Sequence, residues 1–375
     1  MNKGKINFYT AVALIVGTVM GAGVLGIPYI ISESGVFPNI ISIVLVGLFS
    51  LMVCLFAGEI MLRTKRTKQF TGLAKKYLGK KGEILMFVSL FFGLNGALIA
   101  YLIGIGETLS FLIGGSAFAG TITFFIFSSV LIYCGIKTIG KSELLLTFLL
   151  VATVLIISLV KLPEVNTSYF KFADYSKMFY SYGVVLFSMI GFSIIPEMEI
   201  TLKNQKQNLF KAITTGMVIC VLTYILFSTV MVGVYNGSVA EIATASLSGV
   251  LKILGSLVAI FAMASAYLSL STSLRDNYFY DLRMSPRAAW LLTISVPLMI
   301  VLILKPSFIG AVAVTGAVMG SLTGILISLI FVSARKNGDE KVKHKVWGGT
   351  WLPYLAVIGF VLGIFYEILL LAGVV

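Results

Sequence analysis

The chain is a series of long apolar runs separated by short polar segments. We find eleven runs, at about 6–31, 37–62, 83–113, 119–136, 142–161, 177–197, 209–234, 249–274, 287–304, 307–333 and 350–373. A helix of about 20 apolar residues crosses the hydrocarbon core of a bilayer. The strands of a membrane barrel would instead alternate polar and apolar residues over about ten positions, and stretches such as 144–160 do not alternate. The pattern predicts an all-α polytopic membrane protein with eleven transmembrane helices.

Composition narrows the class of protein further. Of the 375 residues, 58% are hydrophobic and only 11% are charged, against about 25% charged in a soluble domain. So few charged side chains cannot cover a soluble surface, and intrinsic disorder requires low hydrophobicity. We therefore expect a single transmembrane domain over 1–375, a multi-pass protein of the cell membrane whose surroundings are the lipid bilayer.

The basic residues indicate how the helices are oriented. If the N-terminus is cytoplasmic, 23 of the 28 Lys and Arg residues fall on the cytoplasmic side, as the positive-inside rule requires. The C-terminus is then extracytoplasmic. The net charge of +13 is thus a topology signal, and we expect no nucleic-acid partner. In the longest basic segment, 63–82, apolar side chains recur at helical spacing, which predicts a short interfacial helix with one apolar face: Phe70, Leu73, Ala74 and Tyr77.

Two runs contain residues that weaken helices. The first reads GTVMGAGVLGIPY over 17–29, and the sixth reads LFSMIGFSIIPEME over 186–199. Inside a helix, glycine costs about 1 kcal/mol and proline about 3 kcal/mol relative to alanine. Close packing through small residues explains Gly17 and Gly21, but it leaves Gly23 and Gly26 unexplained, so we interpret these two as part of a break. Two interrupted helices at corresponding positions of oppositely oriented halves predict the binding site of a secondary transporter.

The chemistry of a broken helix indicates the ligand. Unwinding frees backbone N–H and C=O groups that lipid cannot satisfy, so a break persists only beside a ligand, an ion or water. Free N–H groups at the start of a half-helix suit a carboxylate, and free carbonyls suit an ammonium group or Na⁺. A zwitterionic amino acid carries both charges. We therefore predict an amino acid substrate.

Four segments carry a resemblance to known families. They are GTVMGAGVLGIPYIISESG at 17–35, AYLIGIGETL at 100–109, FSMIGFSIIPEM at 187–198 and, more loosely, AYLSLSTSLRDNYFYDL at 266–282. They resemble the amino acid/auxin permease and aromatic amino acid permease families of the amino acid–polyamine–organocation superfamily. The resemblance implies the five-plus-five inverted-repeat fold with discontinuous helices 1 and 6. The repeats would run about 6–161 and 177–333, with an extra helix at 350–373.

The resemblance also implies a substrate site. On helix 1, the amides of Ala22 and Gly23 would face the substrate carboxylate, with Gly21 allowing close approach. On helix 6, the backbone around Ser188 and Gly191 would face the amino group, and an aromatic side chain would close over the ligand. The implied substrate-binding residues are Gly21, Ala22, Gly23, Phe187, Ser188, Gly191 and Phe192.

A cation site is implied where helix 1 faces helix 8. Its ligands would be the carbonyls of Gly17 and Met20 and the hydroxyls of Ser271 and Thr272, with Ser269 as an alternative. These are oxygen ligands, as a hard cation such as Na⁺ requires. The alternative is that the hydroxyls bond back to their own helix.

The identity of the coupling ion stays open at this stage. The fifth run has no lysine of the kind that some proton-coupled relatives carry, which favours Na⁺. The aromatic permeases that the chain also resembles are generally taken to be proton-coupled. Glu107 is the candidate proton carrier, because an ionisable residue inside a membrane is a functional candidate by default; the alternative is a carboxylate near the outer interface. Asn95, Tyr101 and Tyr267 are further candidates for the pocket wall.

Together these features predict a secondary active transporter that carries neutral amino acids by cation-coupled symport. An aromatic or large neutral amino acid is favoured, and a small neutral amino acid is the alternative. The sequence contains no P-loop, nucleophile elbow or triad pattern, so we expect no enzyme and no cofactor other than the coupling Na⁺ or H⁺. We infer no obligate protein partner. The alternatives are an amino acid sensor that binds without transporting and, less favoured, a channel.

Overall fold

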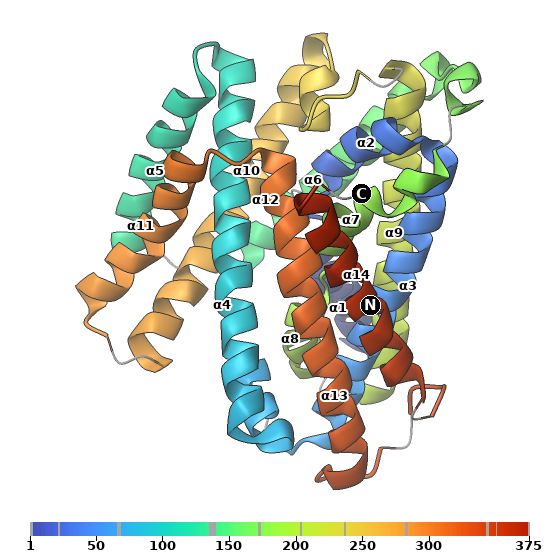
Figure 1. The fold of residues 1–375 in the computed structure, drawn as a ribbon, viewed down its shortest axis with the longest axis vertical. Coiled ribbons are helices and arrows are strands. Elements are labelled where there is room, and N and C mark those ends of the chain that lie inside the picture. Colours follow the sequence, from blue (N-terminus) through green and yellow to red (C-terminus); the bar gives the residue numbers. More distant parts are fainter. Residues whose placement is uncertain are drawn as a thin grey trace.

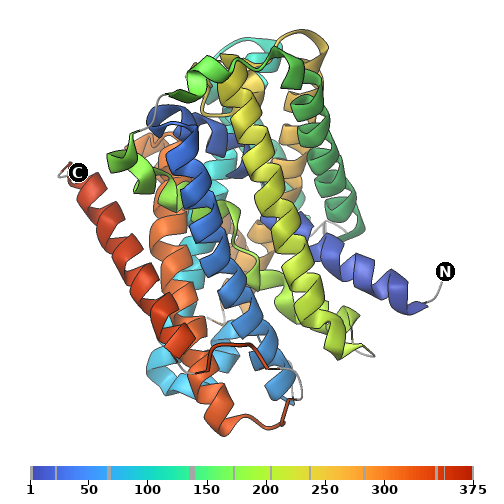
Figure 2. The same ribbon diagram turned by 90° about the vertical axis from the view of Figure 1, so that its right-hand side faces the viewer.

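The structure of the protein is a computed structural model. It describes residues 3–21, 23–65, 69–134, 140–171, 174–202, 205–235, 238–281, 284–342, 345–349 and 351–373. Within these ranges all regular secondary structure is helical. The helices lie side by side in one bundle (Figures 1 and 2).

Each of the eleven predicted runs corresponds to a helix or to a group of helices. The first five are α1 (Lys3–Val19) with α2 (Gly23–Ser34), α3 (Val36–Arg63), α4 (Phe70–Ile113), α5 (Ala117–Tyr133) and α6 (Gly140–Lys161). The next four are α7 (Tyr182–Ser188) with α8 (Ile195–Thr201), α9 (Leu209–Tyr235), α10 (Gly249–Asp276) and α11 (Pro286–Leu304). The last two are α12 (Phe308–Val314) with the π-helix η8 (Thr315–Gly320) and α13 (Ser321–Asn337), and α14 (Trp351–Leu371).

Short helices connect these segments or extend them. Their bounds are η1 (Leu162–Glu164), η2 (Thr167–Lys171), η3 (Tyr175–Ser181), η4 (Phe192–Ile194), η5 (Lys206–Asn208), η6 (Ala243–Ser246) and the π-helical η7 (Asn277–Asp281). Among the described residues, eight helices are long and apolar enough to cross a membrane by length and composition. The pair α1 and α2 meets the same test as one span bent by 53°, whereas α5, at 17 residues, is a shorter apolar helix.

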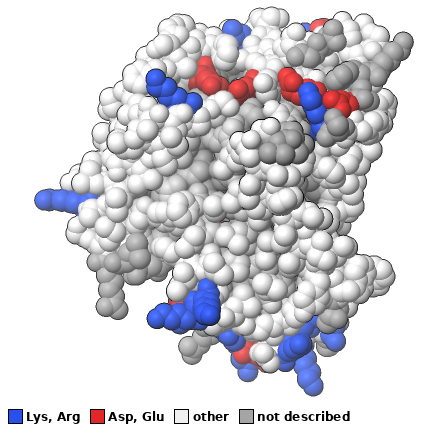
Figure 3. Space-filling model, in the orientation of Figure 1, with Lys and Arg blue, Asp and Glu red and all other residues white. Residues whose placement is uncertain are grey.

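The surface is divided as expected for a membrane protein. Figure 3 shows Lys and Arg side chains gathered at the lower end of the molecule with few acidic ones, whereas acidic and basic side chains lie together near the upper end. The lower end is where the connections from α3 to α4 and from α13 to α14 lie (Figure 1). The broad band between the two ends is almost free of charge, apart from the left-hand edge of this view (Figure 3). We call the lower end the basic end of the bundle.

The predicted interfacial helix forms the first part of α4. The backbone of Gly79 is not helical (φ 74°, ψ −166°), so residues 70–78 make a separate short helix before the long span. The four side chains of the predicted apolar face are buried, which confirms the amphipathic pattern. They pack against the protein: the Tyr77 hydroxyl lies 2.9 Å from the Thr64 hydroxyl, and Ser333 of α13 donates to the Tyr77 carbonyl.

A buried carboxylate ties the helices together at the basic end. Glu59 of α3 is fully buried, and it accepts hydrogen bonds from Arg63 at 2.8 Å and from Arg335 of α13 at 3.0 Å. Its second oxygen accepts from the backbone amide of Val346 at 2.7 Å. Arg335 also donates to the carbonyl of Gly349. One carboxylate therefore joins α3, α13 and the segment that leads to α14.

Candidate substrate site

The first helix is interrupted between Val19 and Gly23. The helix α1 ends at Val19 and α2 begins at Gly23, and Ala22 lies outside the described residues. The prediction that Gly23 and Gly26 belong to the unwound stretch is wrong, because both lie within α2. Both lie in close contacts between helices: a Cβ atom on Gly26 would lie 2.8 Å from the Cδ1 atom of Ile309 on α12, the end of a flexible side chain.

Gly23 brings the two broken helices together. A Cβ atom on Gly23 would overlap the Ser188 hydroxyl and would lie 2.9 Å from the Ser188 Cα atom. Because Ser188 is the last residue of α7, the start of α2 touches the end of α7 directly. No side chain larger than hydrogen fits between them.

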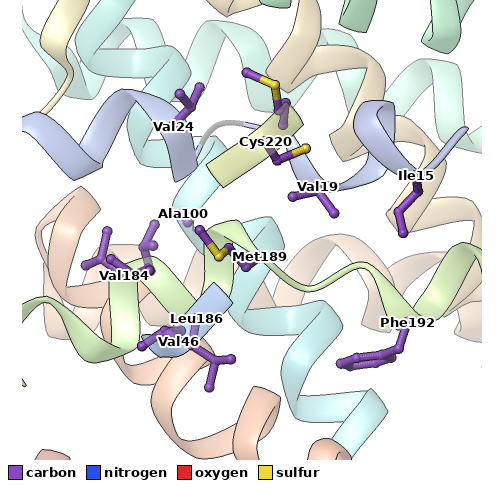
Figure 4. Packing of buried hydrophobic residues seen from close by; sticks show 14 of the residues in the cluster. Ile15, Val19, Val24, Val46, Ala100, Val184, Leu186, Met189, Phe192 and Cys220 are labelled. Atoms are coloured by element: carbon purple, nitrogen blue, oxygen red, sulfur yellow. The ribbon is translucent and has the colours of Figure 1, made fainter. Parts of the chain in front are cut away.

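The sixth helix is broken directly after Ser188. Residues 189–191 are not helical, η4 follows, and α8 begins at Ile195. Pro196 is the second residue of α8, where a proline is tolerated because the first amides of a helix have no intrahelical partner. Figure 4 shows Val19 and Met189 next to the two breaks and Phe192 beyond the second. Both discontinuous helices are therefore present as predicted.

Two hydroxyl groups from neighbouring helices satisfy carbonyls at the breaks. The hydroxyl oxygen of Tyr224, in the middle of α9, lies 2.8 Å from the Val19 carbonyl oxygen and 2.8 Å from the Ser188 carbonyl oxygen, so its single proton is shared between the two carbonyls. Ser50 of α3 donates to the Met189 carbonyl. Tyr224 was not predicted from the sequence; the available signal was a tyrosine at mid-span, away from the membrane interfaces where this residue is common.

A cavity of about 190 Å³ lies beside the two breaks. Five of the predicted substrate residues line it, and they are Gly21, Gly23, Phe187, Ser188 and Phe192. Gly191 does not line it; a Cβ atom there would lie 2.8 Å from a methyl group of Val19, so this glycine packs against α1. Tyr101 lines the cavity, and its hydroxyl lies 3.6 Å from the position of a Cβ atom on Gly21. The structure thus brings most of the predicted set together.

The cavity lies between the breaks and the basic end. Its wall on α4 runs from Ser89 to Tyr101, around the middle of the span, and four of the six lining residues on this helix lie in the half nearer the interfacial helix. On the opposite side of the breaks, α2 closes onto α7 and α12 through Gly23 and Gly26. The Phe192 ring packs edge-to-face against Phe70 of the interfacial helix, with ring centres 6.1 Å apart.

The wall is apolar and aromatic, with scattered hydroxyl groups. None of the described lining residues carries a charged side chain. The hydroxyl groups belong to Thr18, Ser89, Tyr101, Ser188, Ser193, Thr315 and Thr323. Mostly apolar cavities with a few placed polar groups are typical of small-molecule sites.

The sequence analysis also missed the contribution of η8. Thr315, Met319 and Gly320 of this π-helix line the cavity, and π-helical turns are frequent at functional sites. A Cβ atom on Gly316 would lie 2.6 Å from the Phe187 backbone nitrogen, so η8 packs closely against α7. The signal was the run VTGAVMGSLTG at 314–324, with three glycines in the middle of a span.

The hydroxyl groups of Ser271 and Thr272, which were predicted as cation ligands, have different surroundings. The Thr272 hydroxyl donates to the Leu268 carbonyl of its own helix at 2.9 Å, as in the alternative interpretation. The Ser271 hydroxyl is buried near that of Tyr267, without a well-formed hydrogen bond among the described residues. Gly17 and Met20 are on or next to α1, which packs mainly against α9, whereas α10 packs mainly against α4 and α6. Thr18, which follows Gly17 in the sequence, and Leu270, which precedes Ser271, both line the cavity.

Three other candidates lie away from the cavity wall. Glu107 of α4 is partly buried and close enough to Glu241 for their charges to interact; Glu241 accepts a hydrogen bond from the Ile309 amide at 3.1 Å. Asn95 donates to the Phe91 carbonyl of its own helix. Tyr267 packs edge-to-face on Phe124, with ring centres 5.2 Å apart.

A helical bundle with two discontinuous helices and a cavity at their breaks is the architecture of a secondary transporter with the inverted-repeat fold. Two solved transporters share this fold. MhsT in complex with L-phenylalanine superposes with a TM-score of 0.66 at 13% identity, covering 94% of this chain and 98% of that one. A mutant manganese transporter of Eremococcus coleocola superposes with a TM-score of 0.60, also at 13% identity, covering 95% and 85%.

The chain belongs to the tryptophan/tyrosine permease family, whose model matches residues 5–368. Its relatives include the tyrosine-specific transport system 1 of Haemophilus influenzae, 23% identical over 94% of this chain and 93% of that protein. The tryptophan-specific transport protein of Shigella flexneri is 23% identical over 92% and 91%. Glutamine transporter 2 of Aliivibrio fischeri is 19% identical over 91% and 93%.

Family and relatives are membrane transporters of amino acids, not enzymes. The match confirms the predicted resemblance to aromatic amino acid permeases. It does not bear on the resemblance to the amino acid/auxin permease family, which stays a prediction.

Proposed function

We propose that the protein is a secondary active transporter that carries neutral amino acids, aromatic ones above all, by cation-coupled symport. The observation that carries this proposal is the cavity bounded by both helix breaks. Its position fits a zwitterion: the N-terminal end of α2 suits a carboxylate, and the carbonyl end of a half-helix suits an ammonium group. In this assignment Gly21 and Gly23 lie at the carboxylate, and the backbone around Ser188 lies at the amino group.

The wall supports a neutral substrate with a large side chain. A charged side chain buried in an apolar cavity without a partner is costly, and the described wall offers none of the opposite charge. Phe187, Phe192 and Tyr101 supply aromatic surface on which a ring can stack. The names of the tyrosine-specific and tryptophan-specific relatives agree with this substrate class.

For the coupling ion we propose Na⁺, held by the carbonyls of Gly17 and Met20 and the hydroxyls of Ser271 and Thr272. Support comes from Thr18 and Leu270, which show that both segments face one cavity. The Thr272 hydroxyl can keep donating its proton to the Leu268 carbonyl while a lone pair of its oxygen coordinates Na⁺. The alternative is H⁺, with Glu107 as the carrier.

For the topology we propose a cytoplasmic N-terminus and an extracytoplasmic C-terminus, with repeats at about 6–161 and 177–333 and an extra helix at 350–373. The basic end of the bundle is then the cytoplasmic end (Figure 3). The cavity lies on that side of the breaks, so the conformation described here faces inward.

We expect a thermal-shift screen of the twenty amino acids to identify the ligand. A ligand that binds the native state raises the apparent stability, by about 2.7 kcal/mol at 100 times its dissociation constant. Tryptophan, tyrosine or phenylalanine should give the largest shift, and replacing choline with Na⁺ should increase it. If the shift is the same in choline and in Na⁺ but grows as the pH is lowered, H⁺ is favoured as the coupling ion. Shifts without counterflow in proteoliposomes would identify a sensor, and no shift with any amino acid would refute the proposed function.

A further inference from the structure

We propose that Tyr224 is a positioning residue that holds the two broken helices in register from behind the cavity wall, and that substrate binding depends on its hydroxyl group. The binding part of this inference rests on the proposed function. The structural part, which concerns the two breaks alone, does not.

The geometry of Tyr224 is specific. Its side chain is fully buried, and its hydroxyl oxygen lies 2.8 Å from the carbonyl oxygens of Val19 and Ser188. Val19 is the last residue of α1 and Ser188 is the last residue of α7. One hydroxyl on a continuous helix, α9, therefore contacts the carbonyl end of both half-helices that precede the breaks.

The physical need for such a contact comes from the helix ends. The last carbonyls of a helix have no intrahelical partner and carry the negative end of the helix dipole. Two such ends that converge in an apolar interior repel each other, and each carbonyl without a donor pays a desolvation penalty. A tyrosine hydroxyl between them places its one proton where the two carbonyl oxygens share it in a three-centre hydrogen bond. The shared proton lets the carbonyl ends of α1 and α7 lie next to each other, close to the contact between Gly23 of α2 and Ser188 of α7.

The contact reaches the cavity through backbone atoms. Val19 and Ser188 both line the cavity, whereas Tyr224 is not among its described lining residues. The Val19 carbonyl also accepts a hydrogen bond from the Gly21 amide at 2.9 Å, and Gly21 lines the cavity too. Tyr224 thus acts on the wall through Val19, Gly21 and Ser188 and does not touch the ligand itself.

A second hydroxyl provides an internal comparison. The Ser50 hydroxyl donates to the Met189 carbonyl and also lies within hydrogen-bond reach of the Cys54 thiol of its own helix, so it supports the break of the sixth helix but not that of the first. Loss of the Ser50 hydroxyl should loosen one break, and loss of the Tyr224 hydroxyl should loosen both. Tyr267 is the matched control, because it is also a fully buried tyrosine, lies away from the cavity, and its hydroxyl has no well-formed hydrogen bond among the described residues.

The first test is hydrogen exchange of the purified protein, read by mass spectrometry with no ligand added. In Tyr224→Phe we expect exchange to rise about tenfold in peptides covering 19–24 and in peptides covering 187–192. In Ser50→Ala it should rise only in the second set, and in Tyr267→Phe in neither. Unchanged exchange in Tyr224→Phe, or a rise at only one break, would overturn the inference.

The second test separates positioning from general stability. We expect the dissociation constant for L-tryptophan or L-tyrosine, measured on folded protein, to rise at least tenfold in Tyr224→Phe, which corresponds to about 1.4 kcal/mol. In Tyr267→Phe it should stay within twofold. A lower unfolding temperature with an unchanged dissociation constant would show a merely structural role and refute the dependence of binding on the hydroxyl. If the wild-type protein binds no amino acid, the proposed function fails, and the exchange measurement still decides whether Tyr224 joins the breaks.

Discussion

Substitution of Gly23 by alanine or leucine abolishes uptake of the amino acid substrate while the protein still inserts into the membrane. The reason is the direct contact between the start of α2 and the end of α7. A Cβ atom at position 23 would lie 2.9 Å from the Cα atom of Ser188, so no rotation of a side chain relieves the overlap. Overpacking of this kind costs about 1–3 kcal/mol, and here it separates the two breaks that form the cavity. Uptake into proteoliposomes is the measurement, with a fall to background expected.

Gly310→Ala is the control for this prediction. Gly310 lies in the first turn of α12 away from the cavity, and the nearest atom to an added Cβ is the Ser307 hydroxyl, at 3.2 Å, which already caps this helix by accepting a hydrogen bond from the Gly310 amide. Its uptake should remain within twofold of the wild type. Gel filtration of each variant shows that it is folded and inserted. Substantial uptake by a well-folded Gly23→Leu protein would contradict the assignment of the site.

Substitution of Glu59 by glutamine lowers the free energy of unfolding by about 3–5 kcal/mol, the range for removing one partner of a buried ion pair. The Glu59 side chain is fully buried, and Arg63 and Arg335 both pair with it. Without the carboxylate, two guanidinium groups remain at the basic end with no countercharge from this position. The measurement is denaturant or thermal unfolding of the purified protein in detergent, followed by loss of the folded gel-filtration peak.

Glu83→Gln is the matched control for Glu59. Glu83 also pairs with a basic residue, Lys75, at 3.1 Å, but that lysine side chain is 66% exposed. Exposed pairs contribute about 0–1 kcal/mol, so Glu83→Gln should leave the unfolding curve nearly unchanged. In the double variant Glu59→Gln with Arg335→Gln, the cost should be less than the sum of the single costs, because fewer charges are left unpaired. Equal effects of Glu59→Gln and Glu83→Gln would show that burial of the network contributes nothing.

The basic-end network and the cavity are parts of one arrangement. Glu59 joins α3 to α13, and η8, which continues into α13, lines the cavity. Phe70 of the interfacial helix packs on Phe192 in the cavity wall.

The helix positions were predictable because the bilayer acts on each helix separately. A span needs about 20 apolar residues whatever its neighbours are, so the runs in the sequence match the helices closely. The interfacial helix at 70–78 was predictable for a similar reason, since its apolar face follows from spacing alone. The break in the sixth helix was located from Gly191 and Pro196, which disfavour a helix locally.

The role of individual glycines was less predictable. Gly23 and Gly26 were attributed to an unwound stretch, but they lie within α2 and allow it to approach α7 and α12. Gly191 was assigned to the substrate and instead packs against Val19 of α1. A glycine that unwinds a helix and a glycine that permits close packing look the same in sequence, because both only lack a side chain. The difference lies in the atoms opposite, which belong to distant parts of the chain.

The sequence by itself determined the class of protein, the placing of its helices and which two of them are interrupted, because hydrophobic length and backbone hydrogen bonding are satisfied within one helix at a time. Only the tertiary structure decided what surrounds the interruptions. Tyr224 reaches the Val19 carbonyl across 205 residues of sequence, and η8 supplies a wall of the cavity from the far end of the chain. Such contacts depend on how the helices pack against one another, and no local pattern of apolar and polar residues records that.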